Sequence, residues 1–138
     1  MNPPPDGFVP YSRPSPYLEL IGPVYEAAAD PAVIGLHIDA RHTNARGFLH
    51  AGVLVALADV LMGHTAHRAG PFETGLVTVS LSTDLPGSAQ AGNWVQGHAS
   101  VVRRGRQLAF TRCQFTADHR LVLAASGVFA TVLTGERA

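Results

Sequence analysis

The amino-acid sequence predicts an α+β domain in which a single antiparallel sheet of about five to six strands wraps one long central helix. The first observation is an almost wholly apolar run at residues 53–63, within a predicted helix at about residues 50–67 that ends near Gly70 and Pro71. The second is a series of three extended runs with short connections, which is typical of an antiparallel meander. With two extended runs before the helix and one directly after it, the predicted order is β, β, α, β, β, β, β.

The composition is that of one domain without a dominant charge. The chain has 138 residues, of which 46% are hydrophobic, and this is enough to form one core. Lys plus Arg and Asp plus Glu each number 10, so no overall field attracts nucleic acid or an anionic membrane surface. Only 14% of the residues are charged, which is low for a small monomer that must cover its surface with polar groups. We therefore expect a homo-oligomer without a nucleic-acid or membrane partner.

The cysteine content and the lack of long apolar runs bear on location. Cys113 is the single cysteine, which excludes an internal disulfide. The sequence shows no signal peptide and no run of about 20 apolar residues. We expect a soluble cytoplasmic protein.

The start of the chain differs from the rest. Residues 1–16 include six prolines, whose fixed φ angle and missing N–H disfavour helix and sheet alike, so we expect an irregular arm. A single domain is predicted over residues 17–138. It begins with one short helical turn, residues 17–21, which Gly22 and Pro23 end.

Two short runs before the long helix are predicted to form a hairpin. They cover residues 24–29 and 32–40, and Asp30 and Pro31 between them are typical of a turn. Residues 41–49 are polar and contain glycine, so we expect a loop that leads into the helix.

The runs after the helix are predicted to complete the sheet. Apolar and hydroxyl side chains alternate in residues 75–83, with Val77, Val79 and Leu81 on one side and Thr78, Ser80 and Ser82 on the other. Three further strands are expected at residues 93–102, 107–116 and 121–133, followed by a polar tail at residues 134–138.

One carboxylate, Asp59, interrupts the apolar run, which is predicted to be a helix buried on every side. Burying an unpaired carboxylate is costly, so this acid must be paired or must lie at a cleft. A buried acid satisfied by the backbone or by an arginine is the structural alternative. Because charged groups are rarely buried without a partner, we favour a functional acid that accepts and returns a proton.

The loop that enters the helix carries a second group of candidates, namely Asn44, Gly47, His50, Ala51 and Gly52. A helix start offers unpaired N–H groups and the positive end of the helix dipole, so a carbonyl oxygen placed there would be polarised as in an oxyanion hole. The backbone N–H of Ala51 is the expected donor. The alternative is that His50 caps the helix and that Asn44 and Gly47 are turn residues.

Two histidines near the predicted helix end could suggest a metal site. His64 and His67 lie three residues apart, a spacing that can place two ligands on one helix face. No cysteine lies nearby and no third ligand is evident, and cations are favourable at a helix C-terminus in any case. We interpret both histidines as structural and predict no metal site.

Two further features each have a functional and a structural interpretation. A hydroxyl of the row that includes Thr78 would reach Asp59 if its strand lies over the helix, whereas a solvated polar face is the alternative.

A tight basic turn is formed by Arg103, Arg104, Gly105 and Arg106. It suits a solvated hairpin turn or the capture of a phosphate, because arginine presents a fork of donors that matches phosphate oxygens.

The chemistry-bearing residues fall into one extended motif, Asn44-x-x-Gly47-x-x-His50-x-Gly52-x-x-x-x-Leu57-x-Asp59. With Thr78 in the following strand and the basic hairpin at residues 101–110, this motif resembles that of the hotdog-fold acyl-CoA thioesterases, specifically their phenylacetic-acid-degradation (PaaI-like) branch. The resemblance covers roughly residues 18–133. It implies hydrolysis of the thioester between coenzyme A and an aryl or medium-chain acyl group, without a cofactor.

The resemblance also implies roles for single residues. Asp59 matches the family's acid, which activates water or attacks the carbonyl, and the Ala51 N–H matches the group that polarises the carbonyl oxygen. Asn44 and His50 match residues beside the thioester, and Thr78 matches a residue that assists the water. The basic turn Arg103, Arg104, Gly105 and Arg106 corresponds to a region that contacts the nucleotide phosphates.

The sequence departs from the family pattern after the histidine, where the family commonly has two glycines. Here Ala51 precedes Gly52, which keeps the N–H but narrows the approach of a substrate. Val55, Ala56 and Met62 lie about one helical turn from Asp59 and are candidates for the acyl pocket, although core packing explains them equally well.

The resemblance implies a homodimer with shared active sites, further assembled into a homotetramer. Helix geometry agrees, because Ala51 and Asp59 are eight residues apart, or about 12 Å along a helix, too far to serve one carbonyl from the same chain. The alternative function is a non-catalytic acyl-CoA-binding hotdog protein, in which the same cleft holds the thioester intact.

Overall fold

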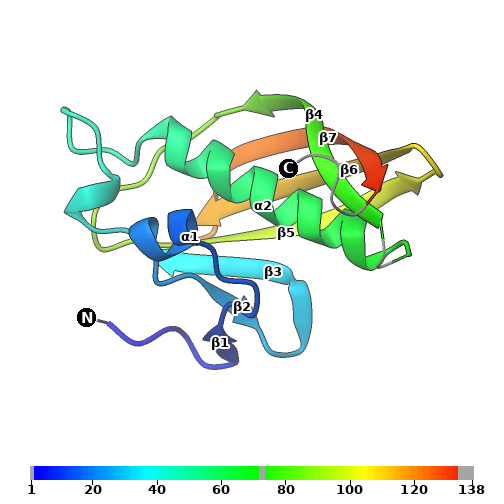
Figure 1. The fold of residues 1–138 in the computed structure, drawn as a ribbon. Helices are drawn as coiled ribbons and strands as arrows, with labels where there is room; N and C mark the ends of the chain where they lie inside the picture. The colour runs from blue at the N-terminus through cyan, green and yellow to red at the C-terminus, as the bar shows by residue number, and fades with distance from the viewer. Residues whose placement is uncertain (1, 72–73, 134–138) are drawn as a thin grey trace.

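The computed structural model describes residues 2–71 and 74–133, so residues 134–138, predicted as a polar tail, lie outside the described residues. Helix α2 (Ala51–Arg68) crosses one face of an antiparallel sheet (Figure 1). The strands are β1 (Phe8–Pro10), β2 (Tyr25–Ala27), β3 (Asp30–His37), β4 (Thr74–Asp84), β5 (Trp94–Arg104), β6 (Leu108–Ala117) and β7 (Arg120–Leu133). Two short helices, α1 (Pro16–Ile21) and the 3-10 helix η1 (Ala40–His42), flank the first hairpin. The predicted α+β architecture is confirmed.

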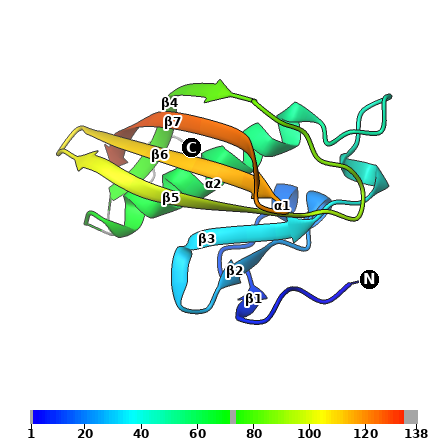
Figure 2. The same ribbon diagram turned by 180° about the vertical axis from the view of Figure 1, so that it is seen from behind.

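The strands of the described ranges form one seven-stranded sheet in the order β1-β2-β3-β5-β6-β7-β4, in which every neighbouring pair is antiparallel. Seen from the opposite side, the sheet lies in front of α2, and no helix of the described residues lies on its outer face (Figure 2). Leu57 and Leu61 of the helix belong to the same core cluster as Phe115 and Phe129 of the sheet, and all four are at most 2% exposed. The core is therefore the layer between α2 and the sheet.

The sheet has one strand more than the five to six that were expected. The extra strand, β1, lies in the arm that was predicted to be irregular throughout, and it pairs with β2. Phe8 and Val9 are free to pair, and Pro10 is tolerated because β1 is an edge strand, where a missing N–H breaks no interior ladder. The prediction was correct for the helical turn that follows, since α1 begins with Pro16 after the N-cap Ser15.

The hairpin of β2 and β3 is confirmed, but its turn lies earlier than expected. The turn is formed by Ala28 and Ala29, and Asp30 is already the first residue of β3, paired with Ala27. The Asp30 carboxylate accepts a hydrogen bond from the backbone N–H of Ala32 at 2.9 Å, which orders the start of this strand.

Helix α2 is not buried on every side, which corrects the expectation from its apolar sequence. Its core side carries Leu54, Leu57, Leu61 and other buried residues, whereas the apolar side chains Val53, Val55, Ala56 and Val60 are partly exposed. The sheet therefore covers part of the apolar helix and leaves a second apolar surface uncovered. In the described part of the chain, no helix combines the length and apolarity needed to cross a membrane.

Strand β4 changes its alternation in the middle, so the predicted separation of its two faces is wrong. Its register with β7 shifts between Thr78 and Ser80, which leaves Val79 without a partner and 59% exposed. In a regular strand, side chains three residues apart lie on opposite faces of the sheet. The bulge shifts this alternation, so Thr78 and Leu81 both lie on the helix side, where Leu81 packs against the core. Ser82 lies on the outer face.

The N-terminal arm is anchored against α2. The N–H of Tyr11 donates to the carbonyl of Val24 at 3.0 Å, and the N–H and hydroxyl of Ser12 both donate to Glu26 Oε1 at 2.7 Å. The Tyr11 ring stacks on the His64 ring with centroids 5.7 Å apart, and its hydroxyl hydrogen-bonds with His64 Nδ1. Four hydrogen bonds and one ring stack therefore place this part of the arm.

Burial changes the titration of the stacked pair. It raises the pKa of Tyr11 to about 12 and lowers the pKa of His64 to about 4, and the positive charges of Arg13 and Arg68 lower the His64 pKa further. Both rings are therefore neutral over a wide range around neutral pH.

The sheet also contains a close contact between a glycine and an aromatic ring. Gly97 of β5 pairs directly with Phe115 of β6, whose ring is fully buried. A Cβ added at Gly97 would lie 2.5 Å from three atoms of that ring. The ring therefore fills the space that any side chain at position 97 would need.

Replacing Gly97 by alanine is expected to lower the free energy of unfolding by about 1–3 kcal/mol, because the new methyl overpacks against Phe115. Equilibrium urea denaturation measures this. Ser100→Ala, at an exposed position of the same strand, is the matched control and is expected to stay within about 0.5 kcal/mol. An unchanged midpoint for Gly97→Ala would mean that the Phe115 ring can move aside.

The free energy of unfolding is expected to fall as the pH is lowered from 6.5 to about 4, because in this window the unfolded chain protonates His64 and the folded chain does not. In His64→Asn this part of the pH dependence should disappear, which urea denaturation at a series of pH values would show. His119→Asn is the control, because His119 is exposed in the β6–β7 turn. Equal pH slopes for the wild type and His64→Asn would contradict the expectation.

Candidate active site

Asp59 lies where α2 faces the edge strand β4. The hydroxyl of Thr78 donates a hydrogen bond to Asp59 Oδ1 at 2.6 Å, and both residues line a cavity of about 390 Å³. The remaining lining residues come from the arm, α2, β4 and β7: Arg13, Val60, Gly63, His64, His67, Gly75, Leu76 and Phe129. The acid is therefore paired and at a cleft, and the strand hydroxyl reaches it as the functional interpretation expected.

The start of α2 offers one free backbone donor. The N–H of Gly52 donates to Nδ1 of His50 at 2.9 Å, so the imidazole is the N-cap of the helix, which agrees with the structural alternative for His50. The exposed Ala51 N–H donates to no acceptor in the described part of the chain. Because Gly52 is capped and Ala51 is not, Ala51 remains the donor available to an incoming carbonyl oxygen.

The loop before the helix is closed by Asn44. Its Oδ1 accepts hydrogen bonds from the N–H groups of Arg46 at 2.9 Å and Phe48 at 3.2 Å. Gly47 has a φ angle of +87°, which few residues other than glycine adopt without strain. The Asn44 amide oxygen thus holds the loop, and none of the hydrogen bonds among the described residues uses its NH₂ group.

The structure does not bring all predicted site residues together in one chain. Asp59 and Thr78 are in direct contact, whereas Asn44, His50 and Ala51 are absent from the lining of their cavity. The continuous helix from Ala51 to Arg68 keeps Ala51 about 12 Å along the axis from Asp59. The predicted site residues of one chain therefore form two separate groups.

The basic turn is partly structural. Arg104 donates from Nε to the carbonyl of Ala66 at 3.2 Å and from a terminal nitrogen to the carbonyl of Gly105 at 2.7 Å. It thus binds the β5–β6 hairpin to the C-terminal end of α2. Arg103 and Arg106 are exposed, so they are the two side chains of this turn that an anion can reach.

The pocket candidates chosen from helix spacing differ from the residues that line the cavity. Met62 is fully buried in the core and Val55 is partly buried, and neither lines the cavity beside Asp59. The apolar wall consists of Val60, Leu76 and Phe129. Val60 could have been found as a direct neighbour of Asp59, but the residues from β4 and β7 depend on sheet register.

Three basic side chains that were not proposed as site residues, Arg13, His64 and His67, also line the cavity. The two histidines were interpreted as structural, and Arg13 belongs to an arm expected to be irregular. Among the described residues, no group of three or more His, Cys, Asp or Glu side chains is arranged to hold a metal ion.

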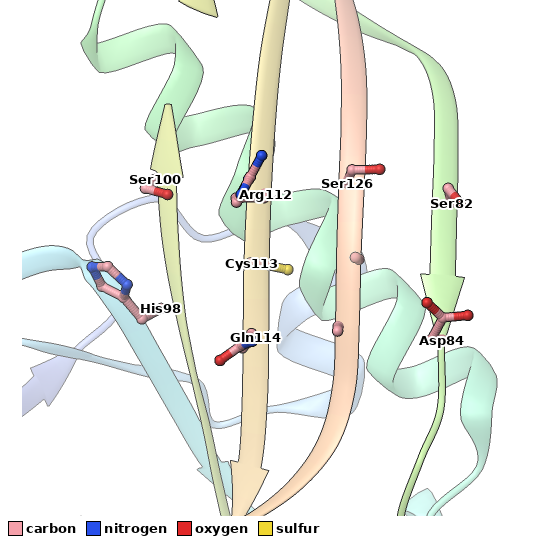
Figure 3. Close-up of a pocket in the computed structure, with 10 residues that line it drawn as sticks. Ser82, Asp84, His98, Ser100, Arg112, Cys113, Gln114 and Ser126 are labelled. Carbon is pink, nitrogen blue, oxygen red and sulfur yellow. The ribbon is translucent and has the colours of Figure 1, made fainter. Parts of the chain in front are cut away.

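A larger cavity, of about 500 Å³, lies on the outer face of the sheet, away from Asp59. Its labelled polar and charged side chains stand in two rows across β4 to β7, Cys113 lies between the rows, and α2 lies behind the strands (Figure 3). Burial raises the pKa of the Cys113 thiol beneath it to about 12, which removes its nucleophilic thiolate at neutral pH. This surface lacks the paired acid and hydroxyl that the cavity at Asp59 holds.

Comparisons with known proteins identify the family of this chain. The model of the thioesterase superfamily matches residues 46–124. The esterase-like protein PA0474 of Pseudomonas aeruginosa is 39% identical over 127 residues, which cover 91% of this chain and 95% of that protein.

Solved structures show the same fold. A variant of the phenylacetic acid degradation protein PaaI from Thermus thermophilus superposes with a TM-score of 0.74 at 26% identity, over 84% of this chain and 98% of that one. The BH2602 protein from Bacillus halodurans, solved with CoA, has a TM-score of 0.69 at 22% identity, over 73% of this chain and 67% of that one. The expected hotdog fold is confirmed.

One long helix packed on a single antiparallel sheet and a family model that spans more than half of the residues agree with each other. The chain belongs to the thioesterase superfamily, as a thioester hydrolase with the hotdog fold.

Proposed function

We propose that the protein is an acyl-CoA thioesterase that hydrolyses an aryl or medium-chain acyl-CoA to the free acid and coenzyme A. The observation that carries this proposal is the hydrogen bond of 2.6 Å between Thr78 and Asp59 in a cavity with an apolar wall. Such a cavity suits an acyl group, and a carboxylate held in place at its edge suits the activation of water. The CoA bound in the BH2602 structure supports the choice of thioester.

In the proposed reaction, Asp59 accepts a proton from a water molecule whose oxygen attacks the thioester carbonyl carbon. The carbonyl oxygen becomes negative and is stabilised by the Ala51 N–H, with Asn44 and His50 beside it. The carbon–sulfur bond then breaks, and the thiolate of coenzyme A takes up the proton. Thr78 holds Asp59 and helps to orient the water. Direct attack by Asp59 would instead give an anhydride that water opens in a second step.

The proposed site combines two subunits. One chain supplies Asp59 and Thr78, and its partner supplies Asn44, His50 and Ala51, because the two half-sites lie about 12 Å apart along one helix. The partly exposed apolar side chains of α2 would be covered in such a dimer. We propose a homodimer of this kind, assembled into a cytoplasmic homotetramer, in which Arg103 and Arg106 contact the phosphates of coenzyme A.

Asp59→Asn is expected to lower thiol release from phenylacetyl-CoA or hexanoyl-CoA by about 10²–10⁴-fold, because the amide cannot accept the proton of water. A thiol reagent measures the release, and circular dichroism checks the fold. Asp84→Asn is the matched control, because Asp84 lies on the outer face of the sheet. Full activity in Asp59→Asn would overturn the assigned role. Saturable binding without thiol release by the wild type would favour a non-catalytic acyl-CoA-binding protein.

The shared site predicts complementation between two inactive variants. Asn44→Asp keeps an oxygen for the loop hydrogen bonds but removes the amide donor, and its activity is expected to fall with that of Asp59→Asn. Unfolded together and refolded as a mixture, the two should recover about a quarter of wild-type activity, because half of the dimers are mixed and each of these has one intact site. Each variant refolded alone is the control. A mixture as inactive as its components would place the whole site within one chain.

A further inference from the structure

The cavity at Asp59 has two chemically different ends. Asp59 and Thr78 form one end, and the apolar residues Val60, Leu76 and Phe129 line the middle. The other end is basic and is formed by Arg13, His64 and His67. An acyl chain bound by its thioester at the first end would extend along the apolar wall towards the basic end.

Helix geometry gives the distance between the two ends. His64 and His67 follow Asp59 on α2 by five and eight residues, which correspond to about 7.5 and 12 Å along the axis. Arg13 lies beside the more distant of them, with a guanidinium nitrogen 3.4 Å from His67 Nδ1. The basic end is therefore separated from the reacting carbon by about the length of a medium-chain acyl group.

The position of Arg13 is determined by its neighbours in the arm. Tyr11 is held by its backbone bond to Val24 and by its contacts with His64, and Ser12 is held by Glu26. Arg13 follows directly after these two residues. The arm thus carries a cation to the far end of the cavity and keeps it there.

No ion pair among the described residues involves Arg13, although Glu26 lies on the adjacent strand and binds Ser12. Arg68, whose guanidinium donates to the carbonyl of Pro31 at 3.0 Å, adds a second positive charge behind the histidines. The low pKa of His64, about 4, keeps that ring neutral at physiological pH. Among the described residues, no ion pair offsets the charges of Arg13 and Arg68 at the basic end, so an anionic group of a ligand would be attracted there.

We infer that this cavity binds acyl groups that carry a carboxylate at the end remote from the thioester, with Arg13 as the residue that recognises it. The substrate class is then the mono-CoA thioester of a medium-chain dicarboxylic acid. This inference rests on the proposed acyl-CoA thioesterase function and adds a specificity to it. The other anionic group of such a ligand is the diphosphate of coenzyme A, and the experiment separates the two.

The test compares kcat/KM for adipoyl-CoA and hexanoyl-CoA, whose acyl groups are of equal length and differ in the terminal carboxylate. The wild type is expected to prefer adipoyl-CoA by about tenfold or more, and Arg13→Gln should remove most of this preference, because it deletes a charge-assisted contact. Arg112→Gln, an exposed arginine on the outer face of the sheet, is the matched control and should keep the preference. Suberoyl-CoA and octanoyl-CoA form a longer pair for the same comparison.

A wild type that prefers the uncharged thioester of both pairs would overturn the inference and leave the proposed function intact. So would an Arg13→Gln variant that loses activity equally on both thioesters, since that places Arg13 on the coenzyme A phosphates. If the wild type hydrolyses none of the thioesters, the proposed function fails. Equilibrium binding of the same pairs to Asp59→Asn then decides the inference, with the ratio of dissociation constants expected to change about tenfold when Arg13→Gln is added.

Discussion

The hydrogen bond between Thr78 and Asp59 joins the edge strand β4 to helix α2, and the candidate site depends on this contact. It is possible because the bulge at Val79 lets Thr78 face the helix while Leu81, three residues later, also packs inward. Without the bulge, regular alternation would put one of the two on the outer face. A local irregularity in one strand thus allows both the core packing of Leu81 and the hydrogen bond from Thr78 to Asp59.

The apolar sequence of α2 exceeds what one sheet can cover. The sheet buries one side of the helix, and Val53, Val55, Ala56 and Val60 stay partly exposed on the other. The same uncovered side carries the acid, and the free N–H of Ala51 lies at the helix start. The surface that would gain burial from a partner is therefore also the surface that carries Asp59, so the proposed assembly and the proposed chemistry involve the same side of the helix.

The main features of the fold could be predicted from the sequence because they depend on local patterns. The long apolar run produced α2, and the short connections produced the meander of β5, β6 and β7, each within two residues of its expected start. Asp59 could be found because a lone carboxylate in an apolar helix is conspicuous. Strand β1 could not be predicted, since its pairing with β2 overrides the irregular tendency of a proline-rich segment. Nor could the bulge in β4 or the contact of Tyr11 with His64, 53 residues away, because tertiary packing decides both.

The strand order also bears on how the molecule folds. Strands β5, β6 and β7 pair with their neighbours along the chain, so their contacts close short loops. Strand β4 pairs directly with β7, so Thr78 lies opposite Phe129, although β5 and β6 separate these two strands along the chain. Closing a long loop costs conformational entropy of the chain before the new contacts can compensate for it. The local hairpins are therefore expected to form early in folding, and the pairing of β4 with β7 late. The acid and the hydroxyl are then brought together only when the sheet is complete, and a nascent chain that has formed its hairpins but not yet docked β4 lacks the assembled pair.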